Sequence, residues 1–296
     1  MIKFNPKRIL LPYDFSKNAD KALSHAAFMC SLLKCDLYLL HVISKSEMLD
    51  ILLPVFKIKN NQVLVNLVND KLETVCTKVR KEYGIKAKSL VSTGSITSEI
   101  VSMCEENKID LVVMGTQGSN SKSDLFLGSN AYRLITKSEI PVMTVKELST
   151  KKGYSNILLP IDLSDHTRQK VDYAVSLAKA FKAKITVLGL YDENEKGNKF
   201  KLEAYAKQIE GVCKAQKVNV ESYVDKTNHR VGKTNTFAKK HKVDLIITMT
   251  DQKRGGKLLE LNSYDHELVH TAKQPVISIH PLLSGLLAGG SAGLPF

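Results

Sequence analysis

The chain repeats itself along its length. The segment ILLPYDFS at residues 9–16 returns as ILLPIDLS at residues 157–164. Three more pairs follow in the same order: DLYLLHV with KITVLGL, KIDLVVMG with KVDLIITM, and IPVMTVKEL with QPVISIHPL. A duplicated domain of roughly 145 residues explains all four pairs, and a domain of that size holds its own core. We therefore expect domains at 1–148 and 149–283, followed by a flexible Gly-, Ala- and Leu-rich tail at 284–296.

Short apolar segments alternate with segments of helical periodicity in each half. In the first half we expect strands at 8–12, 36–43, 86–92, 110–114 and 142–146, and helices at 17–33, 62–83, 95–107 and 129–137. The strands are rich in leucine and β-branched residues, which is typical of a parallel sheet covered on both faces. The predicted fold class is α/β, with two tandem doubly wound, Rossmann-like parallel-sheet domains.

Composition limits the class of protein. With 43% hydrophobic and 25% charged residues, a chain of 296 residues fills two cores and shows no general disorder. No apolar segment approaches the roughly 20 residues that cross a bilayer, and the N-terminus lacks a signal peptide, so we expect a soluble cytoplasmic protein without membrane contact. The net charge of +13 favours anionic partners. Because the lysines are dispersed, a solvated surface is favoured over nucleic-acid binding.

Cysteine and histidine usage predicts neither a disulfide framework nor a metal site. The five cysteines are Cys30, Cys35, Cys76, Cys104 and Cys213. They form an odd set without a CxxC pair, so buried, inert thiols are favoured, although a redox role stays open. The eight histidines are scattered without the spacing of metal ligands.

The most informative functional motif combines Gly115, Gly118, Gly128 and Ser129, directly after the apolar segment LVVM. A glycine past a buried strand adopts backbone angles closed to other residues and so brings its amides against a phosphate. A helix that starts near Ser129 offers unpaired amides and the positive end of its dipole. The spacing predicts a cradle for nucleotide phosphates.

Two further segments are expected at the same place. Asp14 follows the first strand and Val42 lies near the end of the second, while Gly115 follows the fourth. In a doubly wound sheet these carboxyl ends meet where the strand order reverses, which is where ligands bind. Asp14 has the alternative role of capping the next helix, a role that falls more naturally to Ser16. His41 is favoured as a strand-end residue over a catalytic base, because no nucleophile accompanies it.

With these residues the chain closely resembles the universal stress protein family. The shared pattern is G-x2-G-x9-G-[ST], together with the aspartate after the first strand and the pair His41-Val42. The resemblance implies an adenine nucleotide alpha hydrolase-like fold and ATP, or another adenine nucleotide, with Mg²⁺ as cofactor. It also implies that Asp14 and the Val42 backbone hold the adenosine, whereas the glycines, Ser129 and Asn130 hold ribose and phosphates. The expected nucleotide-binding residues are Pro12, Asp14, Val42, Met114, Gly115, Gly118, Gly128, Ser129 and Asn130.

The second half departs from this pattern. Alignment on Pro141 and Pro275 places Gly128 opposite Asn262 and Ser129 opposite Ser263. Gly115 and Gly118 then fall opposite approximately Thr250 and Lys253. Without the glycines we expect weak ATP binding or none. The second half is instead predicted to act as a built-in partner, with 142–146 and 276–280 pairing antiparallel in an intramolecular pseudo-dimer. A homodimer through another surface stays open.

The predicted function is that of an adenine nucleotide-binding sensor or adaptor in the stress response, acting through the N-terminal domain. The alternatives are an interaction module that binds no nucleotide, or a slow ATPase or phosphotransferase. The intact glycine pattern disfavours the first alternative. Against the second, the sequence has no Walker-type lysine after the glycines, no evident arginine finger and no paired carboxylates near the loop, which phosphoryl transfer uses. We predict no catalytic residue, and enzymatic activity is at most a weak ATPase.

Overall fold

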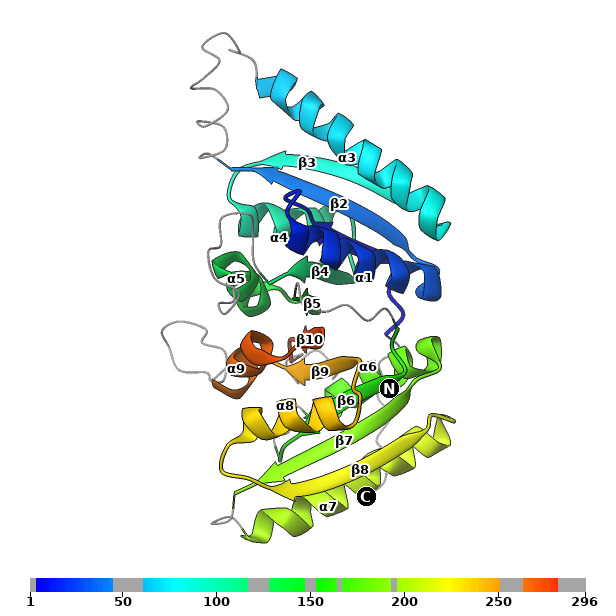
Figure 1. The fold of residues 1–296 in the computed structure, drawn as a ribbon, viewed down its shortest axis with the longest axis vertical. Coiled ribbons are helices and arrows are strands. Elements are labelled where there is room, and N and C mark those ends of the chain that lie inside the picture. The colour runs from blue at the N-terminus through cyan, green and yellow to red at the C-terminus, as the bar shows by residue number, and fades with distance from the viewer. Residues whose placement is uncertain are drawn as a thin grey trace, which may run out of the picture.

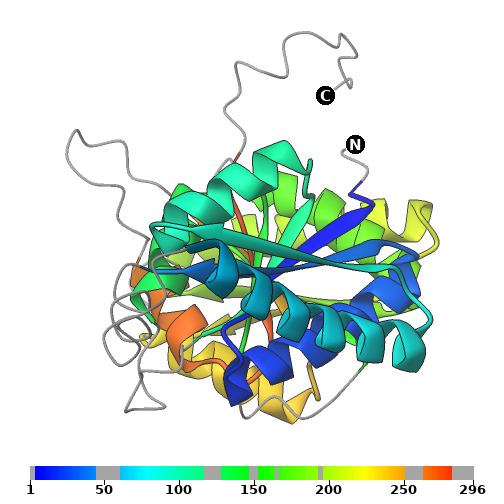
Figure 2. The same cartoon turned by 90° about the horizontal axis from the view of Figure 1, so that it is seen from above.

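The computed structural model describes residues 4–44, 61–116, 128–146, 153–163, 167–192, 196–250 and 263–281. These residues form a ten-stranded sheet with helices on both faces (Figures 1 and 2). The strand order is β3-β2-β1-β4-β5-β10-β9-β6-β7-β8. The two halves of the chain therefore contribute five neighbouring strands each, and the predicted α/β fold with two tandem domains is confirmed.

The first half contains all the strands and helices expected there. Its elements are β1 (Arg8–Pro12), α1 (Lys17–Leu33), β2 (Asp36–Ile43), α3 (Asn61–Tyr83), β3 (Ala87–Thr93), α4 (Ile96–Glu106), β4 (Leu111–Gly115), α5 (Ser129–Lys137) and β5 (Val142–Val145). The chain runs outward from β1 to β2 and β3, and then returns past β1 to β4 and β5, all parallel. The strand order consequently reverses between β1 and β4.

The second half repeats this order of elements. They are β6 (Asn156–Ile161), α6 (Thr167–Phe181), β7 (Lys184–Tyr191), α7 (Lys196–Ala215), β8 (Val220–Lys226), α8 (Arg230–Lys240), β9 (Leu245–Met249), α9 (Ser263–Thr271) and β10 (Val276–Ile279). Its strands are also parallel, with β6 between β7 and β9. The repeat seen in the sequence is therefore a repeat of topology.

The halves join along an antiparallel seam between β5 and β10. Val276, Ile277 and Ser278 lie opposite Thr144, Met143 and Val142, respectively. The predicted intramolecular pairing is thus confirmed, and it covers two strand edges that would otherwise be exposed. Beside the seam, α1 contacts the segment before β6, where His25 Nδ1 and the Tyr154 hydroxyl are 2.9 Å apart.

The core consists of two apolar layers, one on each face of the sheet. One layer lies beneath α1, α3, α6 and α7, and the other beneath α4, α5, α8 and α9. Successive β1 residues alternate between them, with Ile9 and Leu11 in the first layer and Leu10 in the second. This two-sided burial explains why the strands are almost continuously apolar. All five cysteines are buried and free, as expected.

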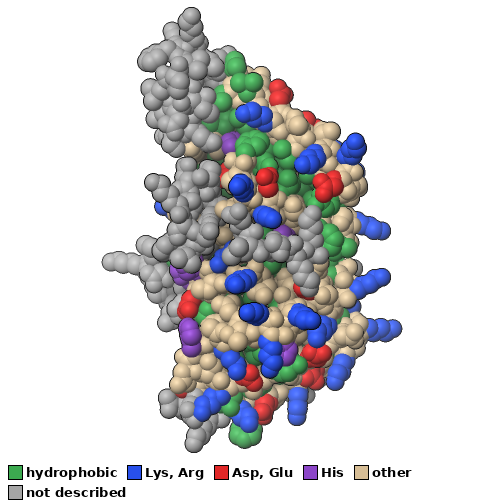
Figure 3. All heavy atoms as spheres, in the orientation of Figure 1, with side chains coloured by type: hydrophobic (Ala, Val, Ile, Leu, Met, Phe, Trp, Pro, Cys, Tyr) green, Lys and Arg blue, Asp and Glu red, His purple; other side chains and the backbone are tan. Residues whose placement is uncertain are grey.

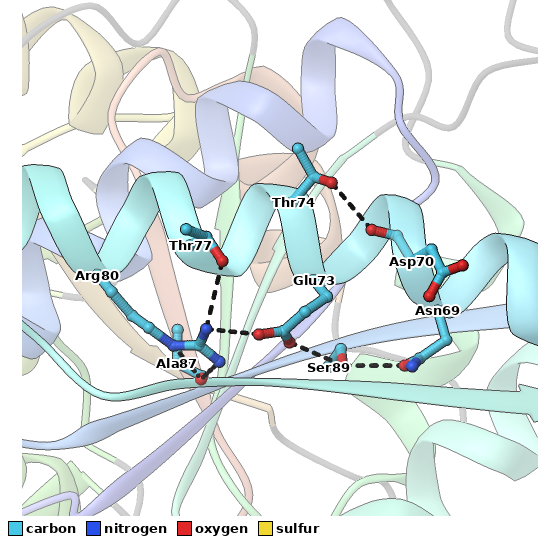
Figure 4. Close-up of polar contacts among 8 residues, drawn as sticks. All are labelled: Asn69, Asp70, Glu73, Thr74, Thr77, Arg80, Ala87 and Ser89. Atoms are coloured by element: carbon cyan, nitrogen blue, oxygen red, sulfur yellow. Dashed lines mark hydrogen bonds and ion pairs between the residues drawn. The ribbon is translucent and has the colours of Figure 1, made fainter.

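Side chains of α3 protect the edge strand β3 (Figure 4). Arg80 donates from Nε and Nη2 to the Ala87 carbonyl at 3.0 and 2.6 Å, and its Nη1 lies 2.5 Å from the Glu73 carboxylate. Ser89 donates to Asn69 at 2.9 Å and to Glu73 at 3.3 Å. Because an edge strand offers unpaired backbone groups to other chains, these contacts reduce the risk of edge-to-edge association.

Lysine and arginine side chains are scattered over the face that Figure 3 shows, with acidic side chains among them. Among the described helices, none combines the length and apolar character that a membrane span requires.

Candidate functional site

The segment that joins β1 to α1 passes the point where the strand order reverses. Within it, Asp14 Oδ1 accepts the Ser16 amide at 3.1 Å. Ser16 in turn is the N-cap of α1, and its hydroxyl accepts the Ala19 amide at 3.1 Å. Ser16 therefore caps the helix, as the sequence suggested, and the half-buried Asp14 carboxylate shapes the turn before it.

This turn contains a residue in a strained conformation. Phe15 has a φ of 60°, in the left-handed region that costs an L-residue about 1–2 kcal/mol. The buried His41 side chain holds the turn in place, since its Nδ1 lies 2.8 Å from the Tyr13 carbonyl oxygen. A carbonyl only accepts, so Nδ1 carries the hydrogen. The Tyr13 amide also donates to Leu40 at 2.8 Å. His41 thus positions the Asp14 turn, a role that the sequence did not reveal although the His41-Val42 pair marked the place.

The remaining predicted residues of β1, β2 and β4 lie at or near the carboxyl ends of their strands. Pro12 is half-buried at the end of β1, opposite Leu40. Val42 and Met114 are buried, and both belong to the apolar layer beneath α4 and α5. The Val42 and Met114 side chains therefore form part of the apolar core on that side of the sheet, beside the polar Asp14 turn.

Gly115 ends β4 against the first turn of α1. A Cβ built at Gly115 would lie 3.2 Å from both the backbone carbon and the carbonyl oxygen of Asn18. The described glycines with positive φ are Gly84, Gly94 and Gly153, so Gly115 is not needed for unusual backbone angles, contrary to the sequence prediction. Its role is steric instead, because a Cβ here would require the α1 backbone to give by a few tenths of an ångström.

The segment after β4 returns to the sheet at the start of α5. The Thr116 amide donates to Val145 at 3.0 Å, and the Gly128 amide donates to the Thr116 carbonyl at 2.6 Å. Gly128 is the N-cap of α5, with φ −59° and ψ 143°, and contributes no capping side chain. The exposed Ser129 and half-buried Asn130 begin the helix. The first-turn amides at this helix end are therefore suited to an anion. Gly118 lies outside the described residues.

In the second half, the counterpart of Gly115 lies one residue earlier than the expected Thr250. Met249 lies opposite Ile279 as Gly115 lies opposite Val145, and the Thr250 amide donates to Ile279 at 2.8 Å, as Thr116 does to Val145. The counterpart of Gly115 is therefore Met249, not Thr250. Met249 is buried in the layer beneath α6, on the face where α1 approaches Gly115 in the first half. Lys253 and Asn262 lie outside the described residues.

A buried carboxylate occupies the first turn of α9. Asp265 is 4% exposed and accepts a hydrogen bond from the Thr248 hydroxyl. In the first half the corresponding residues are the apolar Ala131 and Met114. The negative charge of Asp265 takes up the favourable end of the helix dipole and repels a second anion. Among the described residues, the start of α9 thus differs from that of α5 in carrying a buried carboxylate. Among the described residues, no group of three or more His, Cys, Asp or Glu side chains is placed to hold a metal ion.

Comparison with known proteins decides the family. The model of the universal stress protein family matches residues 5–146 and again residues 153–280. The chain belongs to the universal stress protein family. Its relatives include universal stress protein MJ0577 of Methanocaldococcus jannaschii, 31% identical over 153 residues, which cover 47% of this chain and 94% of that protein. Universal stress protein G of Escherichia coli O157:H7 is 29% identical over 145 residues, covering 47% of this chain and 99% of that protein.

Solved structures support the tandem fold across almost the whole chain. A universal stress protein from Archaeoglobus fulgidus superimposes with a TM-score of 0.74 at 18% identity, covering 93% of this chain and 98% of that one. Protein PA1789 from Pseudomonas aeruginosa superimposes with a TM-score of 0.62 at 14% identity, covering 96% and 95%. At such identities the likeness establishes the architecture of this universal stress protein, not its ligand.

Proposed function

We propose that this universal stress protein binds one adenine nucleotide per chain, in its first half, and acts as a nucleotide-dependent sensor or adaptor in the stress response. The ligand we favour is ATP, with Mg²⁺ bound through its phosphates. The binding residues would be Pro12, Asp14, Val42, Met114, Gly115, Gly118, Gly128, Ser129 and Asn130.

One observation carries the proposal. The first turn of α5 starts at a glycine without a capping side chain, close to the reversal of strand order between β1 and β4. Amides and the positive dipole end of such a turn favour a phosphate, and this place in a doubly wound sheet is where ligands bind. The second half has Asp265 in the same turn of α9, which supports one site per chain.

The Asp14 turn supports the proposal that the nucleoside binds at the segment between β1 and α1, while the phosphates bind at the start of α5. A carboxylate accepts hydrogen bonds from sugar hydroxyls or from an exocyclic amine. The strain at Phe15 and its support by His41 add to the proposal, because strained residues concentrate where the backbone positions a ligand.

The adaptor part of the proposal rests on where α5 lies. Its first turn would hold the phosphates, and in the same helix the Tyr132 ring lies 5.2 Å from the His266 ring of α9, edge to face. A phosphate that shifts or stiffens α5 would therefore act on the contact between the halves. Such coupling requires that the ligand binds the two arrangements of α5 with different affinity.

Matched substitutions at equivalent turns test the binding site. Asp14→Asn retains an oxygen for the Ser16 amide but removes the carboxylate charge, and we expect ATP–Mg²⁺ affinity to fall about tenfold, or about 1.4 kcal/mol. Asp162→Asn makes the same change after β6 and should leave the affinity unchanged. Isothermal titration of both variants and the unmodified chain measures this. Equal affinities for all three would exclude the assigned role of Asp14.

A further inference from the structure

The C-terminus of α1 brings two cysteines together. Lys34 has left-handed backbone angles, φ 54° and ψ 52°, and the Cys35 amide donates to the Cys30 carbonyl at 3.2 Å. This is the Schellman arrangement, in which the side chains at the positions of Cys30 and Cys35 usually touch as an apolar pair. Here that contact joins two thiols.

The two sulfur atoms are in contact and are shielded from solvent. Cys35 Sγ lies 3.1 Å from Cys30 Sγ, with exposed fractions of 4% and 0%. A disulfide has an S–S distance of about 2.05 Å. The backbones are already joined by a hydrogen bond, and forming the disulfide would shorten the Sγ–Sγ distance by about one ångström.

Other helix ends in the chain show that the fold does not require sulfur here. Four more helices end with the same amide-to-carbonyl bond, each at 2.9 Å. The pairs that occupy the two positions are Cys104 and Ile109, Ala178 and Ala183, Cys213 and Val218, and Ala238 and Val243. Ala178 and Ala183, at the end of α6, are the counterparts of Cys30 and Cys35 in the repeat. Two alanines thus satisfy the packing, and among these five helix ends only that of α1 carries a dithiol.

We propose that Cys30 and Cys35 are a reversible redox site, which peroxide-class oxidants convert to an intrachain disulfide. The Cys35 thiol, nearer to solvent, loses its proton and attacks the peroxide, giving a sulfenic acid and, for hydrogen peroxide, one water. The Cys30 thiol then displaces the sulfenic hydroxyl as a second water and forms the S–S bond. The peroxide gains the two electrons that the thiols lose, and a thiol reductant reverses the change by exchange.

The surroundings of the two cysteines make their oxidation slow, but confine disulfide formation to this pair. The hydrogen bond that Cys30 shares with Cys35, and then burial, raise the pKa of Cys30. The reactive thiolate is therefore scarce, and oxidation requires opening of the helix end next to the exposed Lys34. Cys76, Cys104 and Cys213 are also buried, and burial raises the pKa of each, to about 11, about 12 and about 11. None of these three has a sulfur partner among the described contacts, so each lacks the resolving thiol.

Peptide mapping of the full chain tests the site. The native protein is treated with hydrogen peroxide, then denatured, alkylated and digested with trypsin. Trypsin cleaves after Lys34, between the two cysteines, so the disulfide would hold peptides 22–34 and 35–45 together. We expect this linked pair, with three alkylated cysteines in place of five, and its complete loss after treatment with dithiothreitol.

Variants separate the site from general oxidation. Cys30→Ala with Cys35→Ala reproduces the alanine pair of α6 and should show no linked peptides, while Cys104→Ala should form them as the unmodified chain does. Five alkylated cysteines after oxidation, sulfinic acids without a linkage, or a disulfide between other cysteines would each overturn the proposal. The mapping of the unmodified chain decides the question even if a variant fails to fold.

Discussion

At the residue scale, Gly115 is where packing and the candidate site coincide. The missing side chain lets the Asn18 backbone approach β4, and a Cβ at this position requires α1 to shift by a few tenths of an ångström. Since α1 starts directly after the Asp14 turn, such a shift also moves that turn. Gly115 is thus fixed by sterics and not by backbone angles.

We predict that Gly115→Ala destabilises the protein by about 1–3 kcal/mol, as overpacking does in well-packed cores, and weakens nucleotide binding in the same variant. Denaturant unfolding and isothermal titration measure the two effects. The control is Gly211→Ala, on the exposed face of α7, where a Cβ would meet no atom within 4 Å. There, alanine should stabilise the protein by about 0.5–1 kcal/mol. A neutral Gly115→Ala would contradict the steric explanation.

His41 is the second residue whose role can be tested alone. His41→Ala leaves the Tyr13 carbonyl without its imidazole donor, and we expect a loss of about 1–3 kcal/mol in the free energy of unfolding. The affinity for ATP should fall as well, because the Asp14 turn loses its support. His229→Ala, at an exposed position before α8, should change stability by less than about 0.5 kcal/mol. If His41→Ala binds ATP with unchanged affinity, His41 does not position the turn.

At the scale of elements, five helices end on a lysine in the left-handed conformation. These lysines are Lys34, Lys108, Lys182, Lys217 and Lys242, with φ between 50° and 57°. Glycine usually occupies this position because it has no Cβ to crowd the backbone. Each lysine is followed by the buried residue that closes the helix end, so these positions carry backbone strain at five equivalent places.

We predict that Lys108→Gly, after α4, stabilises the protein by about 0.5–1 kcal/mol. Relief of the left-handed strain, about 1–2 kcal/mol, outweighs the greater entropy that glycine gives the unfolded chain. Lys207→Gly, on the exposed face of the interior of α7, should instead destabilise by about 1 kcal/mol. Thermal unfolding of both variants checks the prediction. Destabilisation by Lys108→Gly would show that the lysine side chain itself stabilises the helix end.

The sequence predicted most elements but not these details. β1, α1, β2 and α5 lie at the predicted residues, because buried strands and the Ser16 cap leave clear signals. The left-handed lysines were missed because no glycine marks them; the repeated order of lysine, small or apolar residue, polar residue and strand was the available signal. The counterpart of Gly115 was misplaced by one residue, although the paired segments KIDLVVMG and KVDLIITM end on Gly115 and Met249 and the strand pairing gives the same match. By contrast, nothing local linked His41 to Tyr13.

At the scale of the whole molecule, the seam between the halves gathers two histidines and a lysine whose pKa values are all lowered. Burial lowers the pKa of His280, after β10, and of His270, in α9; the neighbouring Lys146 lowers that of His270 further. Lys146 itself follows β5, donates to the His270 carbonyl and has a pKa lowered by burial. The contact between the two halves is therefore most stable when these histidines are neutral.

We predict that the free energy of unfolding falls as the pH drops below about 6.5. An unfolded histidine takes up its proton near pH 6.5, whereas these two do so at lower pH in the folded protein, so acid favours unfolding. Denaturant titrations at pH 7.5 and 5.5 give the change in the free energy of unfolding with pH, and His280→Gln should make this change smaller. His229→Gln serves as an exposed control. An unchanged pH dependence in His280→Gln would remove His280 from the explanation.

The molecule as a whole is a pseudo-dimer, with one nucleotide site proposed in its first half and none proposed in its second. The most direct measurement is to purify the full chain without added nucleotide, denature it, and quantify the released small molecules by mass spectrometry, with an ATP–Mg²⁺ titration of the stripped protein beside it. We predict one adenine nucleotide per chain in the titration, and the same compound as the main released species. Two per chain would contradict the proposal of a single site, and no binding in either measurement would contradict the proposed function.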